Sequence, residues 1–158
     1  MLVMTHFLLF FLSLGSNPEL KMIHDIIEDA DIANLVWALG SSTNTDAGYP
    51  LYFSKKLDRG FVGVHPSMYA SVKYDISKTK EGYVYEYSDT MAENCDVLIS
   101  WWQKHHPDAL EEKRLEVLIT TYNGGIAGRR KSQEPYVQRV MWFYELAKLM
   151  RETVCEND

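Results

Sequence analysis

The chain has little of several features that mark particular classes of protein. It holds 2 cysteines among 158 residues, Cys95 and Cys155, and no close Cys/His pairs of the kind that bind zinc, so we expect no metal or other cofactor. The two cysteines would pair only in an oxidising compartment, and the sequence leaves that open. Basic residues are in the minority, with 16 Lys and Arg against 22 Asp and Glu. Nucleic-acid-binding proteins usually have the opposite balance, so no nucleic-acid partner is expected.

No stretch reaches the roughly 20 apolar residues that span a bilayer. The apolar run at residues 7–14 (FLLFFLSL) has the length of a signal-peptide core, but no Lys or Arg precedes it. Two interpretations of residues 1–16 therefore stay open: an export signal, or a segment kept in the mature protein as its one contact with a membrane. Residues 17–158 are expected to form the folded domain.

The composition is that of a folded domain, with 46% hydrophobic residues and 13% aromatic residues. Apolar residues recur at helical spacing in four places. The expected helices cover residues 17–40, 88–106 and 108–124, and a last one begins at Pro135. Residues 41–87 are irregular and hold seven of the ten tyrosines, so short helices and turns are expected there, with a strand or extended arm at residues 80–87. The predicted fold is mainly α, with a long irregular aromatic-rich middle segment.

Three short motifs give a more specific signal. Thr121-Tyr122-Asn123-Gly124-Gly125 ends the third expected helix, and Tyr136-Val137-Gln138-Arg139-Val140 follows on the last one. Upstream, residues 59–67 read RGFVGVHPS. In order and spacing these resemble the A-Y-N-A-G … Y-V-x-x-V and R-G-L-M-Q-I-x-P-S patterns of the lytic transglycosylase and goose-type lysozyme family. The resemblance covers roughly residues 20 to 150.

The resemblance implies a lysozyme-like fold and action on peptidoglycan, with cleavage of the bond between MurNAc and GlcNAc. In that family one glutamate protonates the leaving oxygen and then acts as base, and the substrate's own hydroxyl attacks. Tyr122 would orient the acid and the sugar. The substrate-binding residues that the resemblance implies are Ser41, Asn44, Gly60, Gly63, Asn123, Gly124 and Tyr136.

The sequence departs from the family's E-S-x-x-N-x-x-A motif at the glutamate itself. Ser41, Asn44 and Ala47 match, but Gly40 stands where the acid should be. Loss of a general acid typically lowers the rate by about 10²- to 10⁴-fold, so Gly40→Glu is expected to restore at least about tenfold. Asp46 would replace the acid only if its loop folded back. Gly63 is a second departure, where the family usually has Gln.

The departure leaves three explanations open: a natural inactive relative that binds glycan without cutting it, a variant from which the acid was removed, or a carboxylate supplied from elsewhere in the chain. Three interpretations of the function therefore stay open. The chain is an enzyme of peptidoglycan that lacks its usual acid, or it is an inactive relative. An inactive relative would bind glycan or serve as a structural component of an envelope-crossing or virion assembly, with other proteins as partners. Both place the chain at the cell envelope, in the periplasm or in a virion. The third interpretation is a helical interaction domain whose motifs match by chance.

Overall fold

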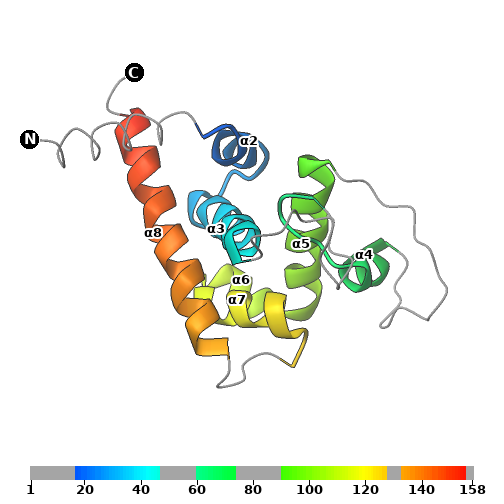
Figure 1. The fold of residues 1–158 in the computed structure, drawn as a ribbon. Helices are drawn as coiled ribbons and strands as arrows, with labels where there is room; N and C mark the ends of the chain where they lie inside the picture. The colour runs from blue at the N-terminus through cyan, green and yellow to red at the C-terminus, as the bar shows by residue number, and fades with distance from the viewer. Residues whose placement is uncertain (1–16, 47–59, 74–89, 128–132, 156–158) are drawn as a thin grey trace, which may run out of the picture.

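The fold is that of a computed structural model and is shown in Figure 1. The structure describes residues 17–46, 60–73, 90–127 and 133–155. Helices take up 82% of these residues and no strand occurs among them, which confirms the predicted mainly α class. In chain order the helices are α2 (Pro18–Ile26), α3 (Ala30–Asp46), α4 (Pro66–Lys73), α5 (Met91–His105), α6 (Pro107–Glu111), α7 (Leu115–Gly124) and α8 (Glu134–Cys155).

Helix α3 forms the centre of the core. Every side chain from Ile32 to Leu39 is buried, including the single polar one, Asn34. A helix that is apolar on all sides has to be covered on all sides, and α2 and the long α8 both pack against α3. Trp37 of α3 meets Phe143 of α8 edge to face, with 6.1 Å between ring centroids. Figure 1 shows α3 in the middle of the arrangement, with α2 and α8 packed against it.

The helix expected over residues 17–40 is in fact two helices. Asn17 begins α2 as predicted, because its Oδ1 accepts a hydrogen bond of 2.9 Å from the amide of Leu20 in the first turn. The chain leaves the helix after Ile26. Asp29 then caps α3, because its carboxylate accepts hydrogen bonds of 3.0 Å from the backbone amide of Asp31 and 3.1 Å from that of Ile32. The apolar stripe continues across this break, so periodicity alone did not reveal it.

Gly40 does not end the helix as predicted, because α3 continues to Asp46. A glycine that ends a helix usually takes a positive φ, and Gly40 is not among the glycines that do. Thr43 donates a hydrogen bond of 2.9 Å from its hydroxyl to the carbonyl of Leu39 and so lies within the continuing helix. Gly40 is buried and serves packing rather than termination.

The third expected helix, over residues 108–124, is also two helices, α6 and α7. Lys113 between them has a φ of 52°, a left-handed conformation that no α-helix passes through. The end of α7 is as predicted, since Gly125 has a φ of 77° directly after Gly124.

The other helix ends are close to expectation. α5 begins after the capping residue Thr90, and it stops before Pro107 as predicted. α8 begins at Glu134, one residue before the expected Pro135. In the middle segment the described residues contain the expected short helix, α4. His65 caps it by accepting a hydrogen bond of 3.1 Å from the amide of Ser67. The strand or arm expected at residues 80–87 lies outside the described residues.

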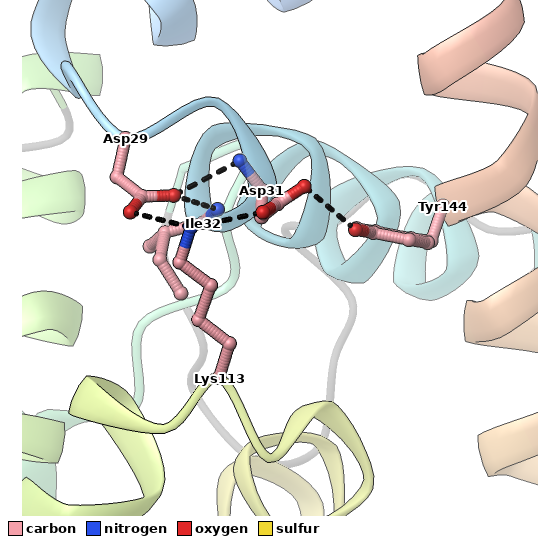
Figure 2. A network of polar contacts seen from close by, with 5 residues as sticks. All are labelled: Asp29, Asp31, Ile32, Lys113 and Tyr144. Atoms are coloured by element: carbon pink, nitrogen blue, oxygen red, sulfur yellow. Dashed lines mark hydrogen bonds and ion pairs between the residues drawn. The ribbon is translucent and has the colours of Figure 1, made fainter.

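A polar network fixes the beginning of α3 (Figure 2). Lys113 forms ion pairs of 3.0 Å with Asp29 and 2.9 Å with Asp31, and the Tyr144 hydroxyl donates to Asp31 over 3.1 Å. The hydrogen bond from Lys113 lowers the pKa of Asp31. Burial raises the pKa of Tyr144 to about 12, and the carboxylate of Asp31 adds to this shift. The network ties the loop before α7 and the middle of α8 to the same end of α3.

A second cluster joins α4 to the end of α5. The hydroxyl of Ser71 and Nε2 of His105 are hydrogen-bonded at 2.9 Å, and Lys104 donates to the Ser71 carbonyl over 2.8 Å. The indole of Trp101 lies against both His105 and His106, at 5.2 and 5.9 Å between centroids. Burial lowers the pKa of both histidines. The neutral imidazoles are therefore the forms that this fold favours.

Cys95 is buried in the core and free, and the side chain of Cys155 lies outside the described residues. Burial raises the pKa of its thiol to about 12. None of the described helices is both long and apolar enough to cross a bilayer. Residues 1–16 lie outside the described residues.

Candidate functional site

The candidate site is built around a tight turn at residues 60–63. The amide of Gly63 donates a hydrogen bond of 3.1 Å to the carbonyl of Gly60, and both glycines have a φ of 69°. This left-handed conformation strongly favours glycine over residues with a side chain. A Gln at position 63, as in the family that the sequence resembles, would therefore be strained in this backbone.

Tyr122 of α7 holds this turn from one side. Its hydroxyl lies 2.7 Å from the carbonyl oxygen of Val62 and 3.2 Å from that of Gly63 and donates to them. These groups are 59 and 60 residues apart in the chain, so the contact is one of tertiary structure. The Tyr-Asn-Gly motif and the RGFVGVHPS segment are thereby brought together.

Gly40 of α3 meets the same turn at Phe61. A Cβ atom on Gly40 would lie 2.5 and 2.7 Å from two carbons of the Phe61 ring and 2.7 Å from the Phe61 carbonyl oxygen. Real Cβ atoms do not approach other atoms so closely, and the backbone oxygen is not free to swing away. Gly40 is therefore the residue that lets α3 touch the turn. The expectation that Gly40→Glu alone restores activity does not fit this geometry, because the first atom of the new side chain already overlaps the turn.

Helix α8 reaches the same end of α3 through the Tyr-Val-Gln-Arg motif. The Arg139 Nε donates a hydrogen bond of 3.0 Å to the hydroxyl of Ser42, which is fully buried. The guanidinium carbon of Arg139 also lies 5.5 Å from the ring centre of Tyr136. Arg139 thus links the ring of Tyr136 to a hydroxyl that lies two residues after Gly40 in α3.

The end of α7 adds an exposed polar group. Asn123 and Gly124 are both exposed, directly after the half-buried Tyr122. The side-chain amide of Gln133, at the start of α8, lies against Gly124 and occupies the space of a Cβ there. The two glycines Gly40 and Gly124 therefore both mark close contacts between elements.

Neither acid of α3 is adjacent to Gly40 along the helix. The helix carries two acids, Asp31 and Asp46. Asp31 lies about 14 Å before Gly40 along the helix axis and is held by Lys113. Asp46 ends the helix about 9 Å beyond Gly40 and belongs to no loop that folds back. Ser41 is half-buried next to Gly40, and Asn44 lies one turn further on, with its side chain outside the described residues.

No family model, no curated protein and no solved structure matches this chain. The described residues also contain no group of three or more His, Cys, Asp or Glu side chains placed to hold a metal ion. Interpretation of the site therefore depends on the residues themselves and on their placement.

Three residues of this site escaped the sequence analysis. Phe61 lies inside the quoted RGFVGVHPS segment, but nothing in its position shows that its ring fills the space beside Gly40. Arg139 lies inside the Tyr-Val-Gln-Arg motif, where its spacing of three from Tyr136 could have indicated a shared helix face. Gln133 carries no signal in the sequence, because its contact with Gly124 is known only from the fold.

Proposed function

We propose that this chain is a lysozyme-like domain that binds the MurNAc-GlcNAc strands of peptidoglycan without cleaving them. The resemblance of three motifs to lytic transglycosylases supports the fold and the ligand. The contacts of Gly40 and Tyr122 with one turn support it further, because the motifs meet in space as well as in order. The proposal assigns the chain to the second of the interpretations above, the inactive relative.

The observation that carries this proposal is the filled space beside Gly40. General acid catalysis at a glycosidic bond requires a carboxylic acid that reaches the leaving oxygen. Position 40 has no side chain, and the Phe61 ring and carbonyl stand where that side chain would begin. A cleft that had lost only its acid would keep space for it. Packing of this kind supports a domain that has no use for the acid.

The groups left at the site suit binding of a sugar polymer. The exposed Asn123 offers an amide donor and acceptor, and the half-buried Ser41 offers a hydroxyl. Tyr136 is half-buried against the core, and its ring, of a kind that stacks on sugar faces, lies beside the positive charge of Arg139. The lactyl and peptide carboxylates of peptidoglycan are anions, so this charge matches the ligand.

The test combines two measurements on purified cell walls. The protein is expected to co-sediment with insoluble peptidoglycan while the turbidity of the suspension stays constant. Asn123→Ala removes an exposed amide without touching the core and should weaken sedimentation about fivefold, the loss of one ligand hydrogen bond. Gln103→Ala removes an exposed amide on α5 and is the matched control, which should sediment like the wild type.

Each other outcome contradicts the proposal in its own way. Clearing of the suspension that is lost on Asp46→Asn would show an enzyme with a misassigned acid. Absence of both clearing and sedimentation would leave a structural component of an assembly, or a helical interaction domain whose motifs match by chance. Equal sedimentation of Asn123→Ala and the wild type would show that glycan binds elsewhere on the molecule.

A further inference from the structure

The chain has a single asparagine that is followed by glycine, Asn123, and this pair lies on the surface. Asn123 and Gly124 are the last two residues of α7, and both are exposed. Gly125 ends the helix, and its amide donates a hydrogen bond of 2.8 Å to the carbonyl of Thr121. Because a helix frays at its last turn, the backbone at Asn123 and Gly124 changes conformation more readily than the backbone inside α7.

An asparagine side chain can react with the backbone nitrogen of the next residue. The nitrogen gives its proton to solvent and attacks Cγ, the Cγ–Nδ2 bond breaks, and the leaving nitrogen takes up a proton and departs as ammonia. Water then opens the cyclic imide at either carbonyl, which gives aspartate or isoaspartate, so one water is consumed for each ammonia released. A side chain on the next residue shields its nitrogen and restricts its backbone, and glycine does neither. Asn123 therefore has the neighbour that hinders this reaction least.

The other asparagines whose side chains the structure describes do not meet these conditions. Asn17 precedes Pro18, whose nitrogen has no proton to lose, and its Oδ1 is already an acceptor in the cap of α2. Asn34 and Asn94 are each 2% exposed, and Oδ1 of Asn34 is hydrogen-bonded to His24 at 2.8 Å. Exposure, a glycine neighbour and a helix end coincide at Asn123.

We propose that Asn123 is a modification site of this chain, at which attack by the Gly124 nitrogen converts the side-chain amide to the carboxylate of aspartate or isoaspartate. The product places a new negative charge on the exposed end of α7. Isoaspartate also lengthens the backbone by one carbon atom directly after Tyr122, which holds the turn at residues 60–63. The modification itself does not depend on the glycan-binding proposal. Its expected consequence, weaker binding of anionic peptidoglycan, rests on that proposal.

Peptide mapping by mass spectrometry tests the modification on the folded full chain, kept at neutral and at mildly alkaline pH. Aspartate and isoaspartate should appear at position 123, faster at alkaline pH because the attacking nitrogen has to lose a proton. Asn34 and Asn94 should stay intact in the same digests and are internal controls. Gly124→Ala should slow the conversion at least about tenfold, because its methyl group shields the nitrogen. The new Cβ would meet the flexible end of the Gln133 side chain, so the fold should be kept.

Three results would overturn the proposal. Asn123 would stay as intact as Asn34 and Asn94 while circular dichroism shows a folded chain, or it would convert only after unfolding in urea. Equal conversion in Gly124→Ala and the wild type would be the third.

Sedimentation with peptidoglycan tests the consequence separately. The converted protein and Asn123→Asp should both sediment at least about fivefold less than the unmodified chain, as for the loss of one ligand hydrogen bond. If the unmodified chain does not sediment, the glycan-binding proposal fails, and the peptide map still decides whether Asn123 is modified.

Discussion

The tight contact at Gly40 gives the sharpest test of the site, through the variant Gly40→Ala. The new methyl group would lie 2.5 to 2.7 Å from the ring and carbonyl of Phe61, so either the turn or α3 has to move. Overpacking of a well-packed core costs about 1–3 kcal/mol. Replacing glycine by alanine inside a helix stabilises the helix by up to about 1 kcal/mol, which offsets part of this cost. The net expectation is a loss of about 1–2 kcal/mol in the free energy of unfolding.

Urea denaturation followed by circular dichroism measures this loss directly, and the slope of the transition should stay constant. Gly124→Ala is the matched control. It is also a helical glycine, but its new Cβ would meet only the end of the flexible Gln133 side chain, which has freedom to shift. We expect this control to lie within about 0.5 kcal/mol of the wild type. If Gly40→Ala proves as stable as the wild type, α3 does not touch the turn, and the argument against space for an acid fails.

Three further predictions concern other parts of the molecule. Tyr122→Phe should lower the free energy of unfolding by about 1–2 kcal/mol in a urea titration, because two backbone carbonyls of the turn lose their donor. The free energy of unfolding should fall as the pH is lowered from 7 to 5, because the pKa values of His105 and His106 are lowered by folding and the unfolded chain therefore binds protons first. The contribution of the two neutral imidazoles to stability is fully present above the unfolded pKa of about 6.5 and is lost as the pH falls through the folded pKa. A double substitution by Gln should flatten this pH profile. The Cys95 thiol, with a pKa raised to about 12, should react with a disulfide reagent at neutral pH only after unfolding, as followed by absorbance.

Local signals in the sequence predicted several helix ends correctly, among them the start of α2 and the end of α7, and they missed ends that depend on long-range contacts. Asn17 caps a helix through its own side chain and Gly125 caps one through its φ, so the sequence alone reveals them. The break between α2 and α3 was missed because apolar residues keep their helical spacing across it. The break at Lys113 was missed for another reason: a lysine with a positive φ is held there by its ion pairs to Asp29 and Asp31, which lie more than 80 residues away.

The site shows the same division between local and long-range causes. Sequence order identified the segments that meet, including Gly40, the turn and Tyr122, because each carries a recognisable short motif. Which atoms fill the space between them depends on the approach of α3 to the turn, and no periodicity encodes that distance. Sequence reasoning therefore placed Gly40 at the glutamate position of the resembled family and expected Gly40→Glu to restore activity, whereas the ring and carbonyl of Phe61 lie where that side chain would begin.

The two departures from the resembled family's pattern have a common physical basis. Gly40 permits the close approach of α3 to the turn, and Gly63 permits the left-handed φ that shapes the turn. If only the catalytic acid had been exchanged in an otherwise intact cleft, position 63 would have no reason to be glycine as well. Both glycines instead suit one packed arrangement, which Tyr122 holds through hydrogen bonds to two carbonyls. A proton donor at position 40 would thus require the turn to be rebuilt together with it, and the proposal of a domain that binds glycan without cutting it rests on this shared packing of both glycines.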